Sequence, residues 1–459
     1  MSDLSKIVKA YDVRGVVPDQ FDEAVARALG TAFVEMLRES GDNADEIVTA
    51  HDMRESGPGL AAAFARGANA AGAAVVSIGL ASTDELYYAS GSLGLPGAMF
   101  TASHNPAQYN GIKLCRAGAK PVGQDSGLAV VRQRAEALLK DLNAEADGPS
   151  RLETRDLLGA YAAHLRSLVD LSGIRPLKVI VDAGNGMGGY TVPAVLGDQV
   201  LPALPLEIVP MYFELDGSFP NHEANPLDPK NVVDLQNAIR EQGADIGVAF
   251  DGDADRCFII DEKGDPVSPS AITALVARRE LAKFPGSTVI HNLITSHAVP
   301  EIITEAGGTP VRSRVGHSFI KAEMARSNAV FGGEHSAHYY FRDFWFADTG
   351  MLAAMHVLAA LGGQDRPLSE FAAEYERYSA SGEINSTVAD AAAKTAEVRA
   401  HFAGAGFDEL DGLTVQLPDG AWFNLRASNT EPLLRLNVEA PKPDRMASLR
   451  DEVLAIVRS

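Results

Sequence analysis

The feature of this sequence that most constrains its fold is an alternation of short apolar runs with helical patterns, which occurs three times in succession. Strands that alternate with helices along a chain form parallel sheets. In each occurrence the last apolar run leads directly into a polar loop. Because open parallel sheets bind ligands beyond the carboxyl ends of their strands, the pattern predicts three α/β units whose loops build one composite site.

The predicted elements define these three occurrences. The first has strands at 47–50, 74–78 and 97–100 and helices at 21–37, 60–71 and 128–142. The second has strands at 178–182, 206–210 and 245–250 and a helix at 232–242. The third has strands at 288–292, 310–314 and 329–331 and helices at 298–306 and 318–326.

The pattern changes after residue 362. Residues 367–378 have helical spacing, three runs at 413–417, 422–425 and 433–439 are typical of antiparallel strands, and 445–457 predicts a closing helix. This order indicates a small α+β domain at the C-terminus. We expect domains at 1–148, 149–255, 256–366 and 367–459.

Charge and composition exclude several classes of protein. With 40 Lys and Arg against 61 Asp and Glu, the formal net charge is -21, which argues against binding to nucleic acid or anionic membranes. No apolar run is long enough to span a bilayer, and the first residues lack the apolar core of a signal peptide, so we expect a cytoplasmic protein. Cys115 and Cys257 form no C-x-x-C pair, so neither a disulfide framework nor a thiolate metal site is expected.

The first polar loop, residues 101–113, has the sequence TASHNPAQYNGIK. Proline disfavours helix in the residue before it, so Asn105 and Pro106 are expected to turn the chain out of the sheet. Ser103 and His104 would then be exposed at a strand end. Taken alone, the loop is better explained as a polar turn.

The second polar loop, DGDADR, is the sharpest chemical signal. Asp251, Asp253 and Asp255 are spaced two apart, and carboxylates this close repel one another unless a cation lies among them. Such hard oxygen ligands suit Mg²⁺ or Ca²⁺. An EF-hand would place Glu262 at its twelfth position but needs glycine where Arg256 stands, and a solvated acidic turn is the remaining alternative.

The segment AGNGMGG contains Gly184, Gly186 and Gly189 in a G-x-G-x-x-G arrangement after a predicted strand. This matches the dinucleotide-binding fingerprint, so a dinucleotide-dependent oxidoreductase is the alternative function. Pro193 lies early in the helix that should follow, and a tight strand-to-helix turn explains the glycines equally well.

Two further loops carry polar clusters. GGEHSAH places Glu334 two residues before Ser336, where they can hydrogen-bond vicinal sugar hydroxyls from one side, although a helix-capping loop explains them equally well. RASNTEP groups four donors that suit a phosphate, and a stabilised turn is its alternative. These donors are Arg426, Ser428, Asn429 and Thr430.

In this order, the motifs KAYDVRG, TASHNP, DGDADR, VGHSFIK, GEHS and RASNTEP resemble those of the α-D-phosphohexomutase family, most closely its bacterial phosphomannomutase/phosphoglucomutase members. The resemblance covers nearly the whole chain. It implies an α/β fold with three similar mixed or parallel-sheet domains and a smaller C-terminal α+β domain around a central cleft. The domains would carry, in order, a phosphoserine loop, a metal loop, a sugar-recognition loop and a phosphate-binding loop.

The resemblance implies that Ser103 is carried as phosphoserine and that Asp251, Asp253 and Asp255 hold Mg²⁺ together with its phosphate. The implied reaction interconverts mannose 1-phosphate and mannose 6-phosphate through a hexose 1,6-bisphosphate, which also acts as activator. Phosphoglucomutase activity is compatible with it. A non-catalytic sugar-phosphate binding protein is the third hypothesis, and a monomer or small homo-oligomer is expected.

The resemblance also implies roles for the other residues. Arg14, Lys113 and Arg256 would stabilise the transferred phosphoryl group. His104 and Lys113 would handle protons, followed by His338 and His317. Sugar hydroxyls would be recognised by Glu334 and Ser336, and the non-reacting phosphate by Arg426, Ser428, Asn429 and Thr430. The chain departs from the family at Ala337, where glycine is common, at His335, and at 289–296, which lacks a lysine.

Overall fold

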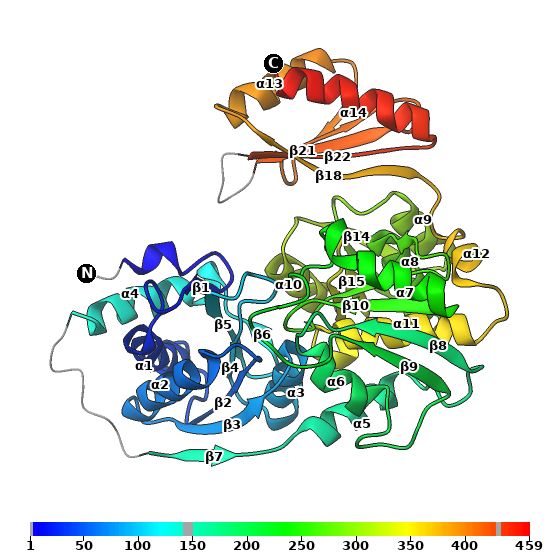
Figure 1. Ribbon diagram of the computed structural model, residues 1–459. Coiled ribbons are helices and arrows are strands. Elements are labelled where there is room, and N and C mark those ends of the chain that lie inside the picture. The colour runs from blue at the N-terminus through cyan, green and yellow to red at the C-terminus, as the bar shows by residue number, and fades with distance from the viewer. Residues whose placement is uncertain (1–2, 141–149, 428–432) are drawn as a thin grey trace. The chain divides into compact units, whose positions relative to one another are not determined.

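The computed structural model describes residues 3–140, 150–427 and 433–459 and divides into two compact units (Figure 1). The first unit comprises Met1–Val267 and Ser336–Ser369, and the second Ser268–His335 and Glu370–Ser459. The chain therefore passes between the units three times. Within the described parts of the chain, no helix is both long and apolar enough to cross a membrane.

The first sheet has the strand order β1-β5-β4-β2-β3-β7, with β6 beside β5. Its strands are β1 (Val13–Val16), β2 (Glu46–His51), β3 (Ala74–Leu80), β4 (Gly97–Phe100), β5 (Tyr109–Arg116), β6 (Lys120–Pro121) and β7 (Leu152–Thr154). The helices are α1 (Glu23–Glu39), α2 (Gly57–Ala70), α3 (Thr83–Leu93) and α4 (Leu128–Leu138). β2 runs parallel to β3 and β4, whereas β5 runs antiparallel to β4 and β1.

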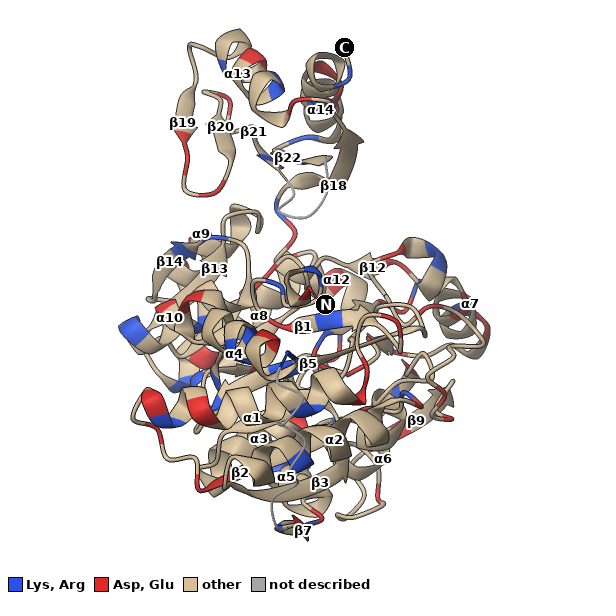
Figure 2. Cartoon of the chain, turned by 90° about the vertical axis from the view of Figure 1, so that its left-hand side faces the viewer, with Lys and Arg blue, Asp and Glu red and all other residues tan. Residues whose placement is uncertain are grey.

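Alternate side chains of β2 enter two different cores. Ile47 packs with Val75 in the core that includes α1, α2 and α4, and Val48 packs with Val76 in the core beneath α3. A sheet covered on both faces needs apolar residues at successive positions, which is why β2 is a short continuous apolar run. On the outer surface, Arg134 of α4 pairs with Glu35 of α1, 3.1 Å apart, and basic and acidic residues are interspersed along both helices (Figure 2).

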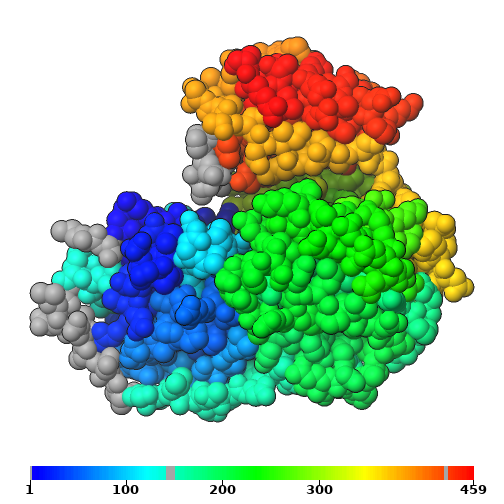
Figure 3. All heavy atoms as spheres, viewed as in Figure 1, coloured from blue at the N-terminus to red at the C-terminus, as the bar shows by residue number. Residues whose placement is uncertain are grey.

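The second sheet has the order β12-β11-β10-β8-β9. Its strands are β8 (Leu177–Asp182), β9 (Leu206–Met211), β10 (Ile246–Phe250), β11 (Cys257–Ile260) and β12 (Pro266–Val267). The helices are α5 (Leu158–Leu168), α6 (Gly188–Val195) and α7 (Val233–Gln242). β8 is parallel to β9 and β10, and β11 is antiparallel to β10. The side chains of this part pack directly against those of the first sheet and its helices (Figure 3).

The first unit is completed by β16 (Tyr339–Phe341), β17 (Ala347–Asp348) and α11 (Gly350–Gly362). Almost every residue of α11 is buried. A helix that is apolar on all sides has no amphipathic periodicity, which explains why the sequence pattern did not predict it.

The second unit contains two sheets. In one, β13 (Thr288–Asn292) lies parallel to both β14 (Thr309–Ser313) and β15 (Phe331–Gly333), with helices α8 (Pro269–Lys283), α9 (Ala298–Glu305) and α10 (His317–Ser327). The other is antiparallel, with the order β18-β22-β21-β20-β19. Its elements are β18 (Ser379–Thr387), α13 (Ala391–His401), β19 (Gly406–Asp408), β20 (Leu413–Gln416), β21 (Trp422–Ala427), β22 (Leu433–Ala440) and α14 (Pro443–Val457).

The predicted fold class is confirmed: the sheets are mixed or parallel in the α/β parts and antiparallel at the C-terminus. Two element predictions were wrong. The helix expected at 367–378 is only α12 (Leu368–Ala372), and the polar stretch after it contains the strand β18. Most of the β18 side chains are not buried, so its sequence lacks the apolar alternation that identifies strands. The domain boundaries stay predictions.

Candidate active site

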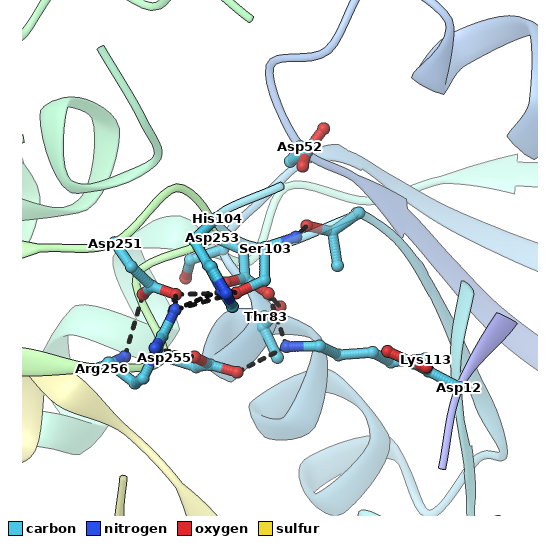
Figure 4. A network of polar contacts seen from close by, with 12 residues as sticks. Asp12, Asp52, Thr83, Ser103, His104, Lys113, Asp251, Asp253, Asp255 and Arg256 are labelled. Carbon is cyan, nitrogen blue, oxygen red and sulfur yellow. Dashed lines mark hydrogen bonds and ion pairs between the residues drawn. The ribbon is translucent and has the colours of Figure 1, made fainter. Parts of the chain in front are cut away.

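Ser103 lies in the loop between β4 and β5, at the carboxyl end of β4. Its hydroxyl donates to Asp251 Oδ2, 2.8 Å away, and lies 3.1 Å from His104 Nδ1 (Figure 4). The residue is only 5% exposed, so the expectation of an exposed hydroxyl was wrong for Ser103. The loop after β10 covers it: a Cβ on Gly252 would collide with the Ser103 carbonyl oxygen.

Asp251, Asp253 and Asp255 follow β10, and all three carboxylates are buried. Ala254 has a positive φ of 60°, which turns the short loop. The Arg256 N–H donates back to Asp251 Oδ1 at 3.2 Å. The acids spaced two apart in sequence are thereby gathered around one point, and one oxygen from each lies within 4.8 Å of the others.

Two cations contact these carboxylates. Lys113 Nζ donates to Asp253 Oδ2 at 2.6 Å and to Asp255 Oδ2 at 2.5 Å. Arg256 Nη2 donates to Asp251 Oδ2 at 2.7 Å and to His104 Nδ1 at 2.5 Å. Because an arginine can only donate, His104 Nδ1 is the acceptor in this bond.

Burial and neighbouring charges set the protonation of the site. Burial, with the positive charges of Arg256 and Arg14, holds the pKa of His104 well below its usual value, so the imidazole is neutral. Burial alone would lower the pKa of Lys113, but Asp253 and Asp255 outweigh it and raise that pKa well above its usual value. In return, Lys113 keeps the pKa of Asp253 below its usual range despite the burial of this carboxyl.

The three carboxylates fit a hard divalent cation. Asp253 Oδ1 and Asp255 Oδ1 are buried and have no hydrogen-bond partner among the described residues. Buried polar atoms without partners are costly, and carboxylate oxygens are the ligands that Mg²⁺ prefers. A second group, formed by Asp255, His338 and Asp348, also has ligand atoms within 4.8 Å of one another.

Other predicted site residues of the first unit lie beside this centre. Arg14 Nη1 donates to Asn105 Oδ1 in the Ser103 loop, 2.5 Å away. His338 Nε2 lies 3.7 Å from Asp255 Oδ1, and Ser336 Oγ lies 3.0 Å from His338 Nδ1. The structure therefore brings together every predicted site residue that belongs to this unit.

The other predicted residues belong to the second unit. Glu334 is buried and its Oε2 accepts from Asn292 Nδ2 at 3.2 Å. His317 begins α10, and Arg426, the penultimate residue of β21, pairs with Glu383 at 3.3 Å. The remaining predicted phosphate ligands, Ser428, Asn429 and Thr430, lie outside the described residues.

The geometry favours neither a dinucleotide-binding site at the glycines of 184–189 nor an EF-hand at the acidic loop. Gly186 allows close packing of loops, since a Cβ there would lie 2.6 Å from the Gly252 carbonyl oxygen. Gly189 is likewise packed against the backbone of Phe213. The EF-hand interpretation places Glu262 at the ion, but its carboxylate instead accepts from the Ser369 N–H at 2.9 Å.

Sequence reasoning missed several residues that support the centre. Arg54 and Asp52 are buried beneath the Ser103 loop, and Thr83 binds Asp253. Asp52 and Arg54 directly follow β2, a neighbour of β4. Charged residues immediately beyond a buried parallel strand are the signal that would have found them.

Comparison with known proteins gives a consistent result. Four models of the phosphoglucomutase/phosphomannomutase family match the chain: alpha/beta/alpha domain I at residues 5–138, domain II at 159–264, domain III at 268–378 and the C-terminal domain at 383–456.

The curated relatives cover nearly the whole chain. The chain is 42% identical to a phosphomannomutase of Salmonella montevideo and 40% identical to one of Escherichia coli K12, over 94% of both chains in each pair. Among solved structures, a phosphoglucomutase/phosphomannomutase family protein of Burkholderia thailandensis is 32% identical, with a TM-score of 0.88 over 100% of this chain and 98% of that one.

Proposed function

The chain belongs to the phosphoglucomutase/phosphomannomutase family, and we propose that it is a phosphomannomutase, an isomerase that interconverts mannose 1-phosphate and mannose 6-phosphate. One observation carries the proposal: Ser103 Oγ lies 2.8 Å from Oδ2 of Asp251, and Asp251 belongs to a loop that contains three buried carboxylates. The relatives named phosphomannomutase support mannose as the sugar. Phosphoglucomutase activity is compatible with the same site.

In the proposed cycle, Ser103 rests as phosphoserine. Its phosphoryl group passes to the free hydroxyl of a hexose phosphate, so the bond from Ser103 Oγ to phosphorus breaks and a bond from the sugar oxygen to phosphorus forms. The proton of that hydroxyl passes through the protein to the released Ser103 Oγ. The resulting hexose 1,6-bisphosphate then reorients and returns its other phosphoryl group: the bond from the second sugar oxygen to phosphorus breaks, the bond from Ser103 Oγ to phosphorus forms again, and the serine proton passes back to that sugar oxygen, so the phosphate has moved on the sugar.

The residues around Ser103 stabilise charge and carry protons in this cycle. Arg256, Lys113 and Arg14 face the transferring group with positive charge. His104 and Lys113 are the proposed proton carriers, and His104 already contacts Ser103 Oγ. Asp251, Asp253 and Asp255 would hold Mg²⁺, which would supply further positive charge beside the phosphoryl group.

The residues outside this centre are proposed to hold the sugar phosphate. Glu334 and Ser336 would bind sugar hydroxyls, and His338 and His317 would also contribute to substrate binding. The phosphate that does not react would be bound by Arg426, Ser428, Asn429 and Thr430. The bisphosphate must bind in both orientations. We therefore expect the protein to contact only the sugar hydroxyls and the phosphate that does not react.

The proposal is tested by incubating the protein with mannose 1-phosphate, Mg²⁺ and a trace of hexose 1,6-bisphosphate, and following the 6-phosphate by phosphorus NMR. We expect conversion that depends on both Mg²⁺ and the bisphosphate. Binding of mannose 1-phosphate without conversion would instead support a non-catalytic binding protein. Comparing kcat/KM for the 1-phosphates of mannose, glucose and glucosamine then identifies the preferred sugar.

A further inference from the structure

Arg54 is the most extensively bonded buried cation beneath the Ser103 loop. It lies three residues beyond the end of β2 and is 2% exposed. Its guanidinium donates to four backbone carbonyl oxygens, three in the Ser103 loop and one at the first residue of β5. These are Ser103 at 3.0 Å, Asn105 at 2.7 Å, Pro106 at 3.0 Å and Tyr109 at 2.8 Å. The loop's carbonyl groups therefore converge on a single side chain.

Asp52 completes this network on the other side of Ser103. The Arg54 N–H donates to Asp52 Oδ1 at 2.9 Å, and Arg54 Nε lies 3.3 Å from Asp52 Oδ2. The Thr101 hydroxyl contacts the same carboxylate and accepts the Ser103 N–H at 2.9 Å. The carbonyl oxygen of Ser103 is thus bonded to Arg54 directly, and its N–H is linked to Asp52 through the Thr101 hydroxyl.

Ser103 needs such support because its backbone is in the left-handed region, with a φ of 51°. For a residue with a Cβ, this conformation is strained and persists only where its surroundings fix it. No helix or strand includes residues 101–108. The Arg54 and Thr101 bonds replace the regular hydrogen bonds that the loop lacks.

Arginine is specifically suited to this position. Its planar guanidinium has five N–H donors in a fixed arrangement, whereas lysine offers three donors at one point and cannot reach four separate carbonyl groups. The second α/β part also covers Arg54: the Phe219 ring lies 5.2 Å from the guanidinium carbon, and a Cβ on Gly217 would lie 2.8 Å from Arg54 Cα.

We propose that Arg54, paired with Asp52, is a positioning residue that fixes the 103–109 backbone so that Ser103 Oγ meets Asp251 and the transferring phosphoryl group. Arg54 acts through main-chain carbonyl groups and does not contact the reacting atoms. The inference rests on the proposed function, since it assigns Arg54 to the phosphoryl transfer at Ser103.

The first test is Arg54→Lys, which keeps the charge but loses the geometry. We expect kcat to fall about 10- to 100-fold while KM stays within about twofold, because displacement of a reacting group by about 1 Å costs rate rather than sugar affinity. Arg166→Lys is the matched control. Arg166 also donates to three carbonyl oxygens, those of Val195, Pro202 and Gly197, at 2.5–2.7 Å, away from the Ser103 loop.

The second test is chemical rescue of Arg54→Ala. Free guanidinium should raise the kcat of Arg54→Ala several-fold, whereas methylammonium should not. Only the planar guanidinium ion can form the four hydrogen bonds to the carbonyl oxygens. If Arg54→Ala does not fold, Thr101→Val replaces it: this variant conserves volume, removes the acceptor of the Ser103 N–H and should also lower kcat with an unchanged KM.

Hydrogen exchange of residues 101–109 gives a readout that needs no turnover. We expect faster exchange in Arg54→Lys than in the wild type or Arg166→Lys. Unchanged exchange together with a kcat within twofold of wild type would overturn the inference, as would a kcat loss matched by Arg166→Lys. A wild-type protein without mutase activity would refute the proposed function instead, and the exchange result would still decide whether Arg54 fixes the loop.

Discussion

The hydroxyl of Thr83 donates to Asp253 Oδ2 at 2.6 Å, and the N–H of Thr83 donates to the Asp253 carbonyl oxygen at 3.1 Å. The first residue of α3 therefore binds both the side chain and the main chain of the central aspartate in the acidic loop of residues 251–255. A helix of the first sheet thus orients a carboxylate that follows the second sheet, and the site depends on how these two parts pack.

Thr83→Val should weaken the response to metal. The substitution conserves volume and the main-chain bond but leaves Asp253 without its hydroxyl donor. Since loss of a group that orients a metal ligand typically costs about 10- to 100-fold in metal affinity, we expect the Mg²⁺ concentration for half-maximal turnover to rise by about tenfold or more. Thr191→Val is the control because the Thr191 hydroxyl donates to the carbonyl oxygen of Met187, the residue before α6. An identical Mg²⁺ response in both variants would contradict the prediction.

Ser103→Ala should fold normally but lose the phosphoryl carrier. After incubation with hexose 1,6-bisphosphate, we expect the intact mass of the wild type, and not of the variant, to include one added phosphate. Turnover should fall by at least about three orders of magnitude, as is usual when a nucleophile is removed. Ser172→Ala, at an exposed position, should keep both properties. A Ser103→Ala protein that still gains the phosphate would place the carrier elsewhere.

Gly186→Ala should impair the mutase without involving a dinucleotide. The added Cβ would lie 2.6 Å from the Gly252 carbonyl oxygen and would push the metal loop away from its position. We expect a lower Tm and reduced turnover, measured by thermal unfolding and phosphorus NMR. Gly159→Ala adds a methyl group with no atom within 4 Å and should leave both unchanged. Tight NADH binding by the wild type, lost in Gly186→Ala, would favour an oxidoreductase.

Glu85→Gln should change how stability depends on pH. Glu85 is 1% exposed, and burial, followed by the negative charge of Asp84, raises its pKa from 4.5 to about 8. Between these pKa values the folded protein keeps a proton that the unfolded chain has released. The wild type therefore loses stability as pH rises, by a few kcal/mol at most.

The glutamine variant has no such proton. Its Tm relative to the wild type should therefore increase from pH 5 to pH 9, whatever its offset at pH 5. Glu153→Gln is the control because Glu153 is exposed, and its Tm difference should stay constant. A constant difference for Glu85→Gln as well would mean that Glu85 is ionised in the folded protein at pH 5.

The features that could be predicted from the sequence are those set by local patterns. Apolar runs such as 47–50 and 288–292 are buried strands because both faces of their sheets are covered. The acidic loop was predicted as a metal site because its three carboxylates require compensation wherever the chain places them. The order of six short motifs was sufficient to identify the family.

The rest depends on contacts that sequence spacing does not contain. Lys113 lies in the interior of β5, and only the pairing of β4 with β5 brings it to the carboxylates that follow β10. Arg54 follows β2 and donates to the loop that follows the neighbouring strand β4. The cytoplasmic location, the oligomeric state and the roles of the individual site residues stay predictions.

The chain leaves the first unit after Val267 and returns at Ser336, and this order has a consequence for synthesis on the ribosome. His338, which lies beside Asp255, is made roughly 80 residues after it, a delay of about 4–17 s at typical elongation rates. Thr349, whose hydroxyl donates to Asp84, is made later still. The nascent chain therefore contains all three aspartates well before the centre can be completed, so the active site is assembled after translation of the third α/β part.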